Sequence, residues 1–390
     1  MSVNSAISNS PINVLFLCSW FPNANNPTLG NFVQKHAEAA AKFNTIHTLA
    51  VFPKSDGPMF DVVQNTPTET VIYYRSAGKG LLGKLISRLR YFRACKKGYK
   101  IARNQLKTID LVHLNVALPM GLFAVYLQRV KRIPFVVTEH ATAYAKGPNQ
   151  YPQKTLRRAV RILNKAALLL PVSDDLGKTL GQLAPKVPQR TISNVVNEAI
   201  FTEKQPTDRL KKRLLHISTA VDAHKNVTGI LEVFARVVQQ RSDVELVIVS
   251  DGNLTPHKET AKKLGILETF VHFETTKTTH EIAAMLQASD ALLLFSNYEN
   301  FPCVIAESLM VGTPVISSNV NGIPEHVNET NGKLVAPKDQ QALETAINDV
   351  LDTCDQYPPN KLRDYALEHF SYEGVGKKLD AVYRSLLNRL

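Results

Sequence analysis

Short apolar runs alternate with longer amphipathic stretches throughout the first half of the chain. The first run, residues 12–18, precedes a polar loop rich in Pro, Asn and Gly and then a helical pattern over residues 31–41. Further apolar runs fall at 47–52, 71–74, 111–114, 135–138 and 168–172, and helical patterns at 121–130 and 175–183. Nearly continuous apolar strands that alternate with helices are typical of a parallel sheet covered on both faces. The first half therefore predicts a doubly wound α/β domain.

The same alternation restarts after residues 202–213, a segment with Pro and Lys that is typical of a linker. Six strand patterns follow, at 214–217, 245–249, 271–273, 291–295, 314–316 and 332–335. Helical patterns cover 227–241, 257–264, 279–288 and 304–311, and a final amphipathic one covers 372–390. We therefore predict an α/β fold of two Rossmann-like doubly wound domains, 1–201 and 202–371, facing each other across a cleft. The helix over 372–390 is expected to pack back on the first domain, and ligands to bind outside the carboxyl ends of the strands.

Composition narrows the setting in which such a protein works. Of 390 residues, 44% are hydrophobic and 21% charged, which provides for a large core and excludes global disorder. The first ten residues are polar, and no apolar run approaches the roughly 18 to 20 residues that cross a bilayer. The four cysteines are widely scattered, which argues against a disulfide framework or a zinc site. We expect a cytoplasmic protein.

Charge is distributed unevenly between the two halves. Residues 1–200 hold 26 Lys and Arg against 9 Asp and Glu, whereas residues 201–390 hold 20 against 25. The segment that begins at Arg75 and ends at Lys107 contains eleven cations and no acid, and its apolar positions 82, 85, 86 and 89 share one helical face. A basic amphipathic helix is typical of a protein that associates peripherally with an anionic membrane, here the inner face. The alternative is a solvated helix whose apolar stripe packs on its own sheet.

The most informative stretch of the chain is residues 290–316. A buried strand ends in a polar turn with Glu299, a helix begins near Pro302 to Val304, and Glu307 lies in its first turns. Because the amides at a helix start attract phosphate oxygens, the two carboxylates flank a candidate anion site. The alternative is that both merely decorate a helix.

This Glu299-x7-Glu307 spacing, followed by the turn Gly312-Thr313-Pro314-Val315, resembles the signature of retaining GT-B glycosyltransferases of family 4, the glycosyl transferases group 1. The resemblance covers nearly the whole chain. It implies that a nucleotide-sugar binds the second domain, that Glu299 contacts the donor sugar, and that Glu307 holds the ribose hydroxyls. The diphosphate would be held by the backbone amides of the residues after Glu299, namely Asn300, Phe301, Pro302, Cys303 and Val304.

Two further segments of the second domain match the same family. Lys225 stands where similar enzymes place a lysine on the donor phosphate, although the Arg that usually precedes it is replaced by Thr219 and Ala220. Whether His224 substitutes for that Arg stays open. Gly252 resembles the family's glycine turn at a strand end, and is either a donor contact or an ordinary turn.

The acceptor side is expected in the first domain. His140 closes a strand in a segment that resembles the family's T-x-H motif, so the resemblance implies a catalytic role beside the donor sugar and acceptor, with Tyr144 nearby. Gly30 lies in a loop that corresponds to the one approaching the diphosphate and acceptor. His36, one helical turn further on, either lines this site or faces the core.

The predicted chemistry is transfer of a hexose from a UDP- or GDP-linked sugar to a saccharide or lipid-linked saccharide, in envelope polysaccharide or lipopolysaccharide synthesis. With no D-x-D motif in the chain, we expect no metal and no cofactor beyond the donor; Lys225 and helix amides would stabilise the leaving diphosphate. The resemblance implies front-face attack with retention. Alternatives are a nucleotide-sugar epimerase or sugar-phosphate synthase of the same fold, or a nucleic-acid-binding protein, which would leave Glu299 and Glu307 without a purpose. We therefore expect no nucleic-acid partner.

Overall fold

Each predicted series of strands forms one sheet in the computed structural model, which describes residues 10–78, 80–144, 150–205 and 209–389. The chain divides into two compact units. The first unit comprises the residues up to 171 together with 177–192 and 375–390, and the second comprises 172–176 and 193–374. The prediction of two Rossmann-like α/β domains is confirmed.

The first unit is built on a seven-stranded sheet in the order β3-β4-β2-β1-β5-β6-β7. All neighbouring strands are parallel except β3 and β4, which form an antiparallel pair at one edge. The strands are β1 (Asn13–Cys18), β2 (Thr45–Lys54), β3 (Phe60–Thr66), β4 (Glu69–Arg75), β5 (Leu111–Asn115), β6 (Phe135–Glu139) and β7 (Leu168–Pro171). Strands β5 and β6 are buried throughout, including the polar side chains of His113 and Glu139.

Helices cover both faces of this sheet because its connections run in opposite directions from β1. The connection from β1 to β2 runs one way across the sheet, and those from β4 to β5, β5 to β6 and β6 to β7 run the other way. Right-handed crossovers therefore place α1 on one face and α2, α3 and α4 on the other. The helices are α1 (Asn31–Ala41), α2 (Leu81–Leu106), α3 (Gly121–Lys131), η1 (Thr142–Tyr144), α4 (Gln153–Leu163) and α5 (Asp174–Leu183).

The last helix, α13 (Tyr372–Leu387), joins the core of the first unit from Val375 onward. Its Tyr383 hydroxyl lies 2.6 Å from Nδ1 of His113, whose Nε2 lies 2.7 Å from Oγ1 of Thr138. Burial lowers the pKa of His113 well below its usual value, so this imidazole stays neutral and serves the core. Gly376 lets the helix approach α1, since a Cβ there would lie 2.4 Å from the carbonyl oxygen of Ala39.

The second unit contains a six-stranded parallel sheet in the order β10-β9-β8-β11-β12-β13. Its strands are β8 (Lys212–Ile217), β9 (Val244–Val249), β10 (Val271–Glu274), β11 (Ala291–Leu294), β12 (Val315–Ser318) and β13 (Gly332–Val335). The strand order reverses between β8 and β11, and in such sheets the ligand binds outside the carboxyl ends of the strands at that point. The topology alone thus directs attention to the loops after β8 and β11.

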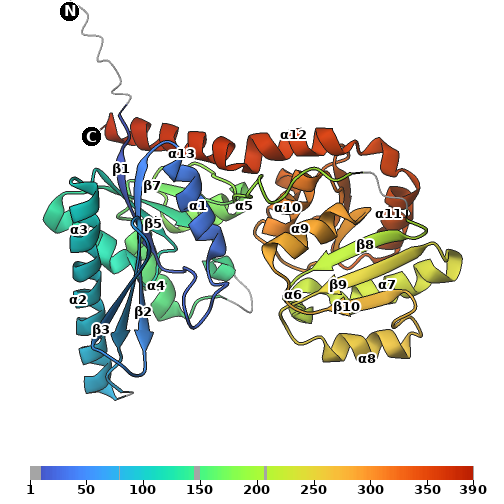
Figure 1. Ribbon diagram of the computed structural model, residues 1–390, viewed down its shortest axis with the longest axis horizontal. Helices are drawn as coiled ribbons and strands as arrows, with labels where there is room; N and C mark the ends of the chain where they lie inside the picture. The colour runs from blue at the N-terminus through green and yellow to red at the C-terminus, as the bar shows by residue number, and fades with distance from the viewer. Residues whose placement is uncertain (1–9, 79, 145–149, 206–208, 390) are drawn as a thin grey trace, which may run out of the picture. The chain divides into compact units, whose positions relative to one another are not determined.

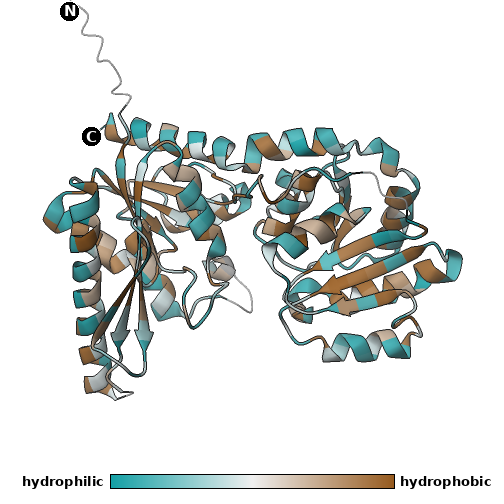
Figure 2. Ribbon diagram, in the orientation of Figure 1, coloured by the Kyte–Doolittle hydropathy of each residue, from teal (hydrophilic) through white to brown (hydrophobic). Residues whose placement is uncertain are grey.

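Around this sheet lie α6 (Asp222–Lys225), α7 (Val227–Gln240), α8 (Thr255–Lys263), α9 (Thr279–Gln287), α10 (Cys303–Val311), η2 (Ile323–Glu325), α11 (Gln340–Asp352), η3 (Cys354–Gln356) and α12 (Pro359–Phe370). Figures 1 and 2 show the labelled elements and the hydrophobic colouring of the strands that form the core of each unit. Among the helices of the described ranges, none is both long and apolar enough to cross a membrane.

Besides the short helical turns α6, η1, η2 and η3, the pattern did not predict four longer elements, namely β3, α4, α11 and α12. β3 is an edge strand whose residues are partly or fully exposed, so it lacks the apolar run by which the other strands are recognised. α4 combines a buried edge at Ala159, Ile162 and Leu163 with a strongly basic outer face.

Candidate active site

An ion pair joins the two loops at the point where the strand order of the second sheet reverses. Lys225 ends the short helix α6 after β8, and Glu299 lies in the turn after β11. The ammonium of Lys225 contacts Oε1 of Glu299, and the Ser296 hydroxyl donates to the same oxygen at 2.8 Å. The side chains of Lys225 and Glu299 are only 19% and 10% exposed. Two groups predicted separately from the sequence thus form one charged site.

Backbone hydrogen bonds fix the distance between these two loops. The N–H of Asn297 donates to the carbonyl of His224 at 2.7 Å, and its side-chain amide donates to the carbonyl of Ala223 at 3.2 Å. The position of Lys225 opposite Glu299 therefore does not depend on the ion pair alone.

The start of α10 is held in the core by its flanking side chains. The Phe301 ring stacks on Phe370 at 5.4 Å between centroids and lies 4.6 Å from His326. The Asn194 amide donates to the carbonyl of Phe301 at 3.0 Å. Asn300 and Phe301 are both buried, so the structure places the Phe301 side chain in packing and leaves a ligand only the backbone of this segment.

Pro302, Cys303 and Val304 open the helix and are partly exposed. Pro302 is the N-cap residue of α10 and has no N–H to donate. The first turn of the helix nevertheless carries a partial positive charge, which favours an anion here. Glu307 lies one turn further along α10 and is also partly exposed. Gly312 ends the helix in the left-handed conformation at φ +82°, against Pro359.

The loop after β12 contributes two residues to the site, Asn321 and Gly322, which the sequence analysis did not identify. The side-chain oxygen of Asn321 accepts the N–H of Glu299 at 3.3 Å, and the N–H of Gly322 donates to the carbonyl of Asn300 at 2.9 Å. A Cβ on Gly322 would lie 2.3 Å from that carbonyl oxygen. The available signal was an Asn-Gly pair in the loop after a strand, the position where ligand loops are expected.

Gly252 packs directly on the turn after β8. A Cβ at this position would lie 2.1 Å from the carbonyl oxygen of Thr219, so only glycine fits. Next to it, Ala220 adopts a left-handed φ of +52°, which is unusual for a residue with a Cβ, and its carbonyl accepts the Nε2–H of His257 at 2.9 Å. The substituted pair Thr219 and Ala220 therefore forms a rigid turn beside Lys225 in place of a second cation.

In the first unit, His36 and His140 belong to one aromatic cluster. His36 is fully buried in α1, and its Nδ1–H donates to the carbonyl of Phe32 at 2.9 Å. His140, partly exposed after β6, lies 5.3 Å from the His36 ring and 4.4 Å from the Phe32 ring. The structure therefore places His36 behind His140 as part of its support.

Gly30 and Tyr144 lie on either side of this cluster in the sequence, and both are confined by packing. Gly30 has a left-handed φ of +67° just before α1, and a Cβ would lie 2.6 Å from the backbone of Trp20. Tyr144 is buried in η1 with its ring edge-on to Tyr151, and burial raises the pKa of its phenol well above the usual value.

Glu139, next to His140, is a buried carboxyl that no sequence motif indicates. It is fully buried, and Oε2 accepts the N–H of Ala117 at 2.8 Å. Burial raises its pKa to about 7. Val116, just before Ala117, has a left-handed φ of +62°, a strained conformation for a β-branched residue, and its carbonyl accepts the Ser19 hydroxyl at 2.7 Å. The carboxyl ends of β1, β5 and β6 are thus tied together beneath His140.

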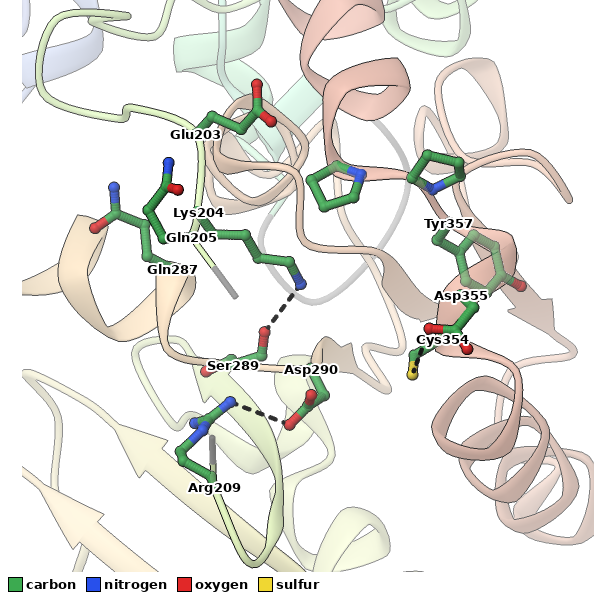
Figure 3. Close-up of a pocket in the computed structure, with 12 residues that line it drawn as sticks. Glu203, Lys204, Gln205, Arg209, Gln287, Ser289, Asp290, Cys354, Asp355 and Tyr357 are labelled. Atoms are coloured by element: carbon green, nitrogen blue, oxygen red, sulfur yellow. Dashed lines mark hydrogen bonds and ion pairs between the residues drawn. The ribbon is translucent and has the colours of Figure 1, made fainter. Parts of the chain in front are cut away.

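A separate pocket of about 550 Å³ in the second unit lies at the amino-terminal edge of the sheet, where Asp290 directly precedes β11 (Figure 3). Arg209 pairs with Asp290 at 3.2 Å, and the Lys204 ammonium donates to the carbonyl of Ser289 at 3.4 Å. Its lining mixes both charge signs, and it lies at the edge opposite to the one where parallel sheets bind ligands. We therefore place the candidate site at Lys225 and Glu299. Within the described ranges, no three His, Cys, Asp or Glu side chains are grouped as they would be around a metal ion.

Residues 200–368 match the family described as "Glycosyl transferases group 1", and residues 31–199 match "Glycosyltransferase Family 4". The "MMP alpha-(1->4)-mannosyltransferase" of Mycolicibacterium hassiacum is 31% identical over 199 residues, which are 48% of this chain and 46% of that protein. The "N-acetyl-alpha-D-glucosaminyl L-malate synthase" of Bacillus anthracis is 24% identical over 302 residues, 73% of this chain and 76% of the relative. The chain thus spans about half the length of the first relative and about three quarters of the second.

Among solved structures, Anabaena Alr3699/HepE in complex with UDP superimposes with a TM-score of 0.73 at 19% identity, over 96% of this chain and 100% of that one. This likeness shows the shared fold of the whole chain.

Proposed function

Because the chain belongs to the group 1 glycosyltransferases, we propose that it transfers a hexose from a nucleotide-sugar to a saccharide or lipid-linked saccharide, with retention of configuration. The observation that carries the proposal is the Lys225–Glu299 pair, which is largely removed from solvent at the point where the strand order reverses, just before the start of α10. Polysaccharide or lipopolysaccharide synthesis is the process we propose for it.

The donor is proposed to bind the second unit with its diphosphate at the start of α10. The first-turn amides of Cys303 and Val304 and the ammonium of Lys225 would then meet the negative charge that builds on the leaving diphosphate. Glu299 would accept a hydrogen bond from a hydroxyl of the donor sugar, and Glu307 would accept hydrogen bonds from the ribose hydroxyls. UDP and GDP are the donor nucleotides that we propose, and the UDP held by the Anabaena protein of the same fold supports the first.

The charge on the diphosphate is neutralised in this scheme by protein groups, so we propose that the transferase works without a metal ion. As the bond to the diphosphate breaks, the anomeric carbon becomes cation-like and its substituents need oriented oxygens. We propose attack by the acceptor hydroxyl from the face of the leaving group, with His140 lying beside the reacting groups and His36 and Glu139 supporting its position.

Segment 75–107 is proposed to bring the enzyme to an anionic membrane, where a lipid-linked acceptor would reside; Lys79 of this segment lies outside the described residues. Of its apolar stripe, Leu82, Leu85 and Leu89 are more than half exposed on α2, as is the preceding Leu81. The buried side of α2 lies further along, at Ala94, Gly98 and Ala102 among others. The exposure of these leucines favours a membrane-facing role over packing on the sheet.

Thermal-shift screening with UDP-, GDP-, ADP- and CMP-sugars tests the proposal, because a ligand that binds only the folded state raises the melting temperature. We expect one UDP- or GDP-sugar to stabilise the protein and Glu307→Gln to weaken its binding about tenfold, since a hydrogen bond to a charged group is lost. Glu329→Gln, an exposed carboxylate in the same unit, is the matched control. Unchanged donor affinity in Glu307→Gln would remove its assigned role.

A further inference from the structure

Three helices on one face of the first sheet carry positive charge only. α2, α3 and α4 contain 14 Lys and Arg and no Asp or Glu. Phe92 of α2 packs edge-on against Phe123 and Tyr126 of α3, at 5.5 and 5.1 Å between ring centroids. Between residues 70 and 173 the only acidic residues are Asp110, whose Oδ2 accepts the N–H of Asn13, and the fully buried Glu139. Neither belongs to these helices.

A groove of about 1000 Å³ lies between α3 and α4 within this basic face. Leu122, Val125 and Ile162 form its apolar part. Six cations surround them, namely Arg129, Lys154, Arg157, Arg158, Arg161 and Lys165. Across the described part of the chain, none of these six side chains forms an ion pair.

The side chains that line the groove are suited to a ligand in which a phosphate group is attached to an apolar group. Four of its six cations are arginines, whose planar guanidinium matches phosphate with two parallel hydrogen bonds. The like charges repel one another until an anion lies among them. The apolar residues would contact the carbon atoms next to a phosphate, which a free inorganic anion lacks. No aromatic side chain lines the groove, so it offers no platform on which nucleic-acid bases could stack.

We propose that the α3–α4 groove binds the phosphate headgroup of an anionic phospholipid at a bilayer surface, with Leu122 and Val125 against the glycerol and first acyl carbons. The inference rests on the membrane association proposed for segment 75–107 and adds a headgroup site on different helices. On this account the leucines of α2 enter the interface, and the groove recognises an individual lipid.

The test is flotation of the full chain with vesicles of phosphatidylglycerol and phosphatidylcholine, compared with phosphatidylcholine alone. We expect Arg157→Glu/Arg161→Glu to lower partitioning onto the anionic vesicles about tenfold or more, because two attractive charges become repulsive. Lys262→Glu/Lys263→Glu on α8 makes the same change in net charge at exposed positions of the second unit and should bind as the wild type does. All variants are checked for an unchanged melting temperature.

Two milder variants distinguish a specific phosphate-binding groove from a basic surface that attracts lipid by charge alone. Arg157→Lys/Arg161→Lys keeps the charge but loses the two-pronged contact with phosphate, and Leu122→Asn removes an apolar contact at an exposed position. We expect each to weaken binding about threefold, whereas a diffuse surface would leave both unchanged and overturn the groove.

The remaining outcomes distinguish the groove from membrane association itself. If Arg88→Glu/Arg93→Glu on α2 abolishes binding while the groove variants bind normally, the groove is wrong and association through segment 75–107 stands. If the wild type shows no preference for anionic vesicles, both are wrong. Tight, salt-sensitive oligonucleotide retention that the groove variants lose, without lipid binding, would assign the groove to nucleic acid instead.

Discussion

At the scale of single residues, Glu139 is a fully buried carboxyl at the end of β6. Its carboxyl group holds the loop after β5 through Ala117, and it directly precedes His140. Ordinary carboxyls are ionised at neutral pH, whereas burial raises the pKa of Glu139 to about 7. Near neutral pH the carboxyl that accepts the hydrogen bond of Ala117 is therefore only partly ionised.

This raised pKa predicts a pH dependence of stability with a definite sign. Between about pH 4.5 and 7 the folded protein keeps a proton on Glu139 that the unfolded chain has released, so stability falls as the pH rises through this window. The loss amounts to at most about 3 kcal/mol. Glu139→Gln keeps an acceptor for Ala117 but cannot ionise, so its stability relative to the wild type should increase by about that amount from pH 5 to pH 8.

Urea unfolding of the wild type and Glu139→Gln at both pH values measures the effect. Glu329→Gln, where the carboxylate is exposed, serves as the control and should show no such divergence. If the difference between Glu139→Gln and the wild type is the same at pH 5 and pH 8, Glu139 does not titrate in this range.

At the scale of elements, the site of the second unit depends on close backbone contacts between the ends of strands. The turn after β8 touches Gly252 after β9, and the turn after β12 touches Asn300 before α10. These contacts place Lys225, Glu299 and the start of α10 at one edge of the sheet. Glycine and asparagine occur in these turns because the backbones approach closely and adopt turn conformations that other residues rarely adopt.

Gly252→Ala should displace the turn that carries Thr219 and Ala220. The new Cβ would lie 2.1 Å from a backbone carbonyl, which cannot rotate away as a flexible side chain would. We expect a loss of about 1 to 3 kcal/mol in stability together with weaker donor binding. Gly80→Ala, which meets no atom within 4 Å and has a φ of −68°, is the matched control and should change neither. Wild-type melting and donor affinity in Gly252→Ala would show that this turn has room to adjust.

At the scale of the whole molecule, the architecture was predictable because it follows from apolar periodicity. The buried parallel strand β11 is a continuous apolar run, and β5 and β6 are mostly apolar, so their positions could be predicted before any contact was known. β3 and α4 were missed because exposed edges and basic outer faces hide the small apolar fraction that packs.

The site was predictable to a lesser degree. Lys225, Glu299 and Glu307 were identified through a motif, and the structure brings the first two into contact. Asn321, Gly322 and Glu139 act through hydrogen bonds to loops far away in the sequence, and no local pattern specifies such partners. The buried position of His36, likewise, is set by how α1 packs and not by its spacing from Gly30.

Calorimetric titration of the nucleotide-sugar found by screening, with excess EDTA, tests the central claim most directly. We expect the Kd in EDTA to equal that in Mg²⁺ within about twofold, and Lys225→Ala to weaken binding about tenfold or more, because the protein's own cation faces the diphosphate. Lys263→Ala, exposed on α8, should bind as the wild type does. Binding that requires the divalent ion, or that Lys225→Ala leaves unchanged in a folded protein, would contradict the account.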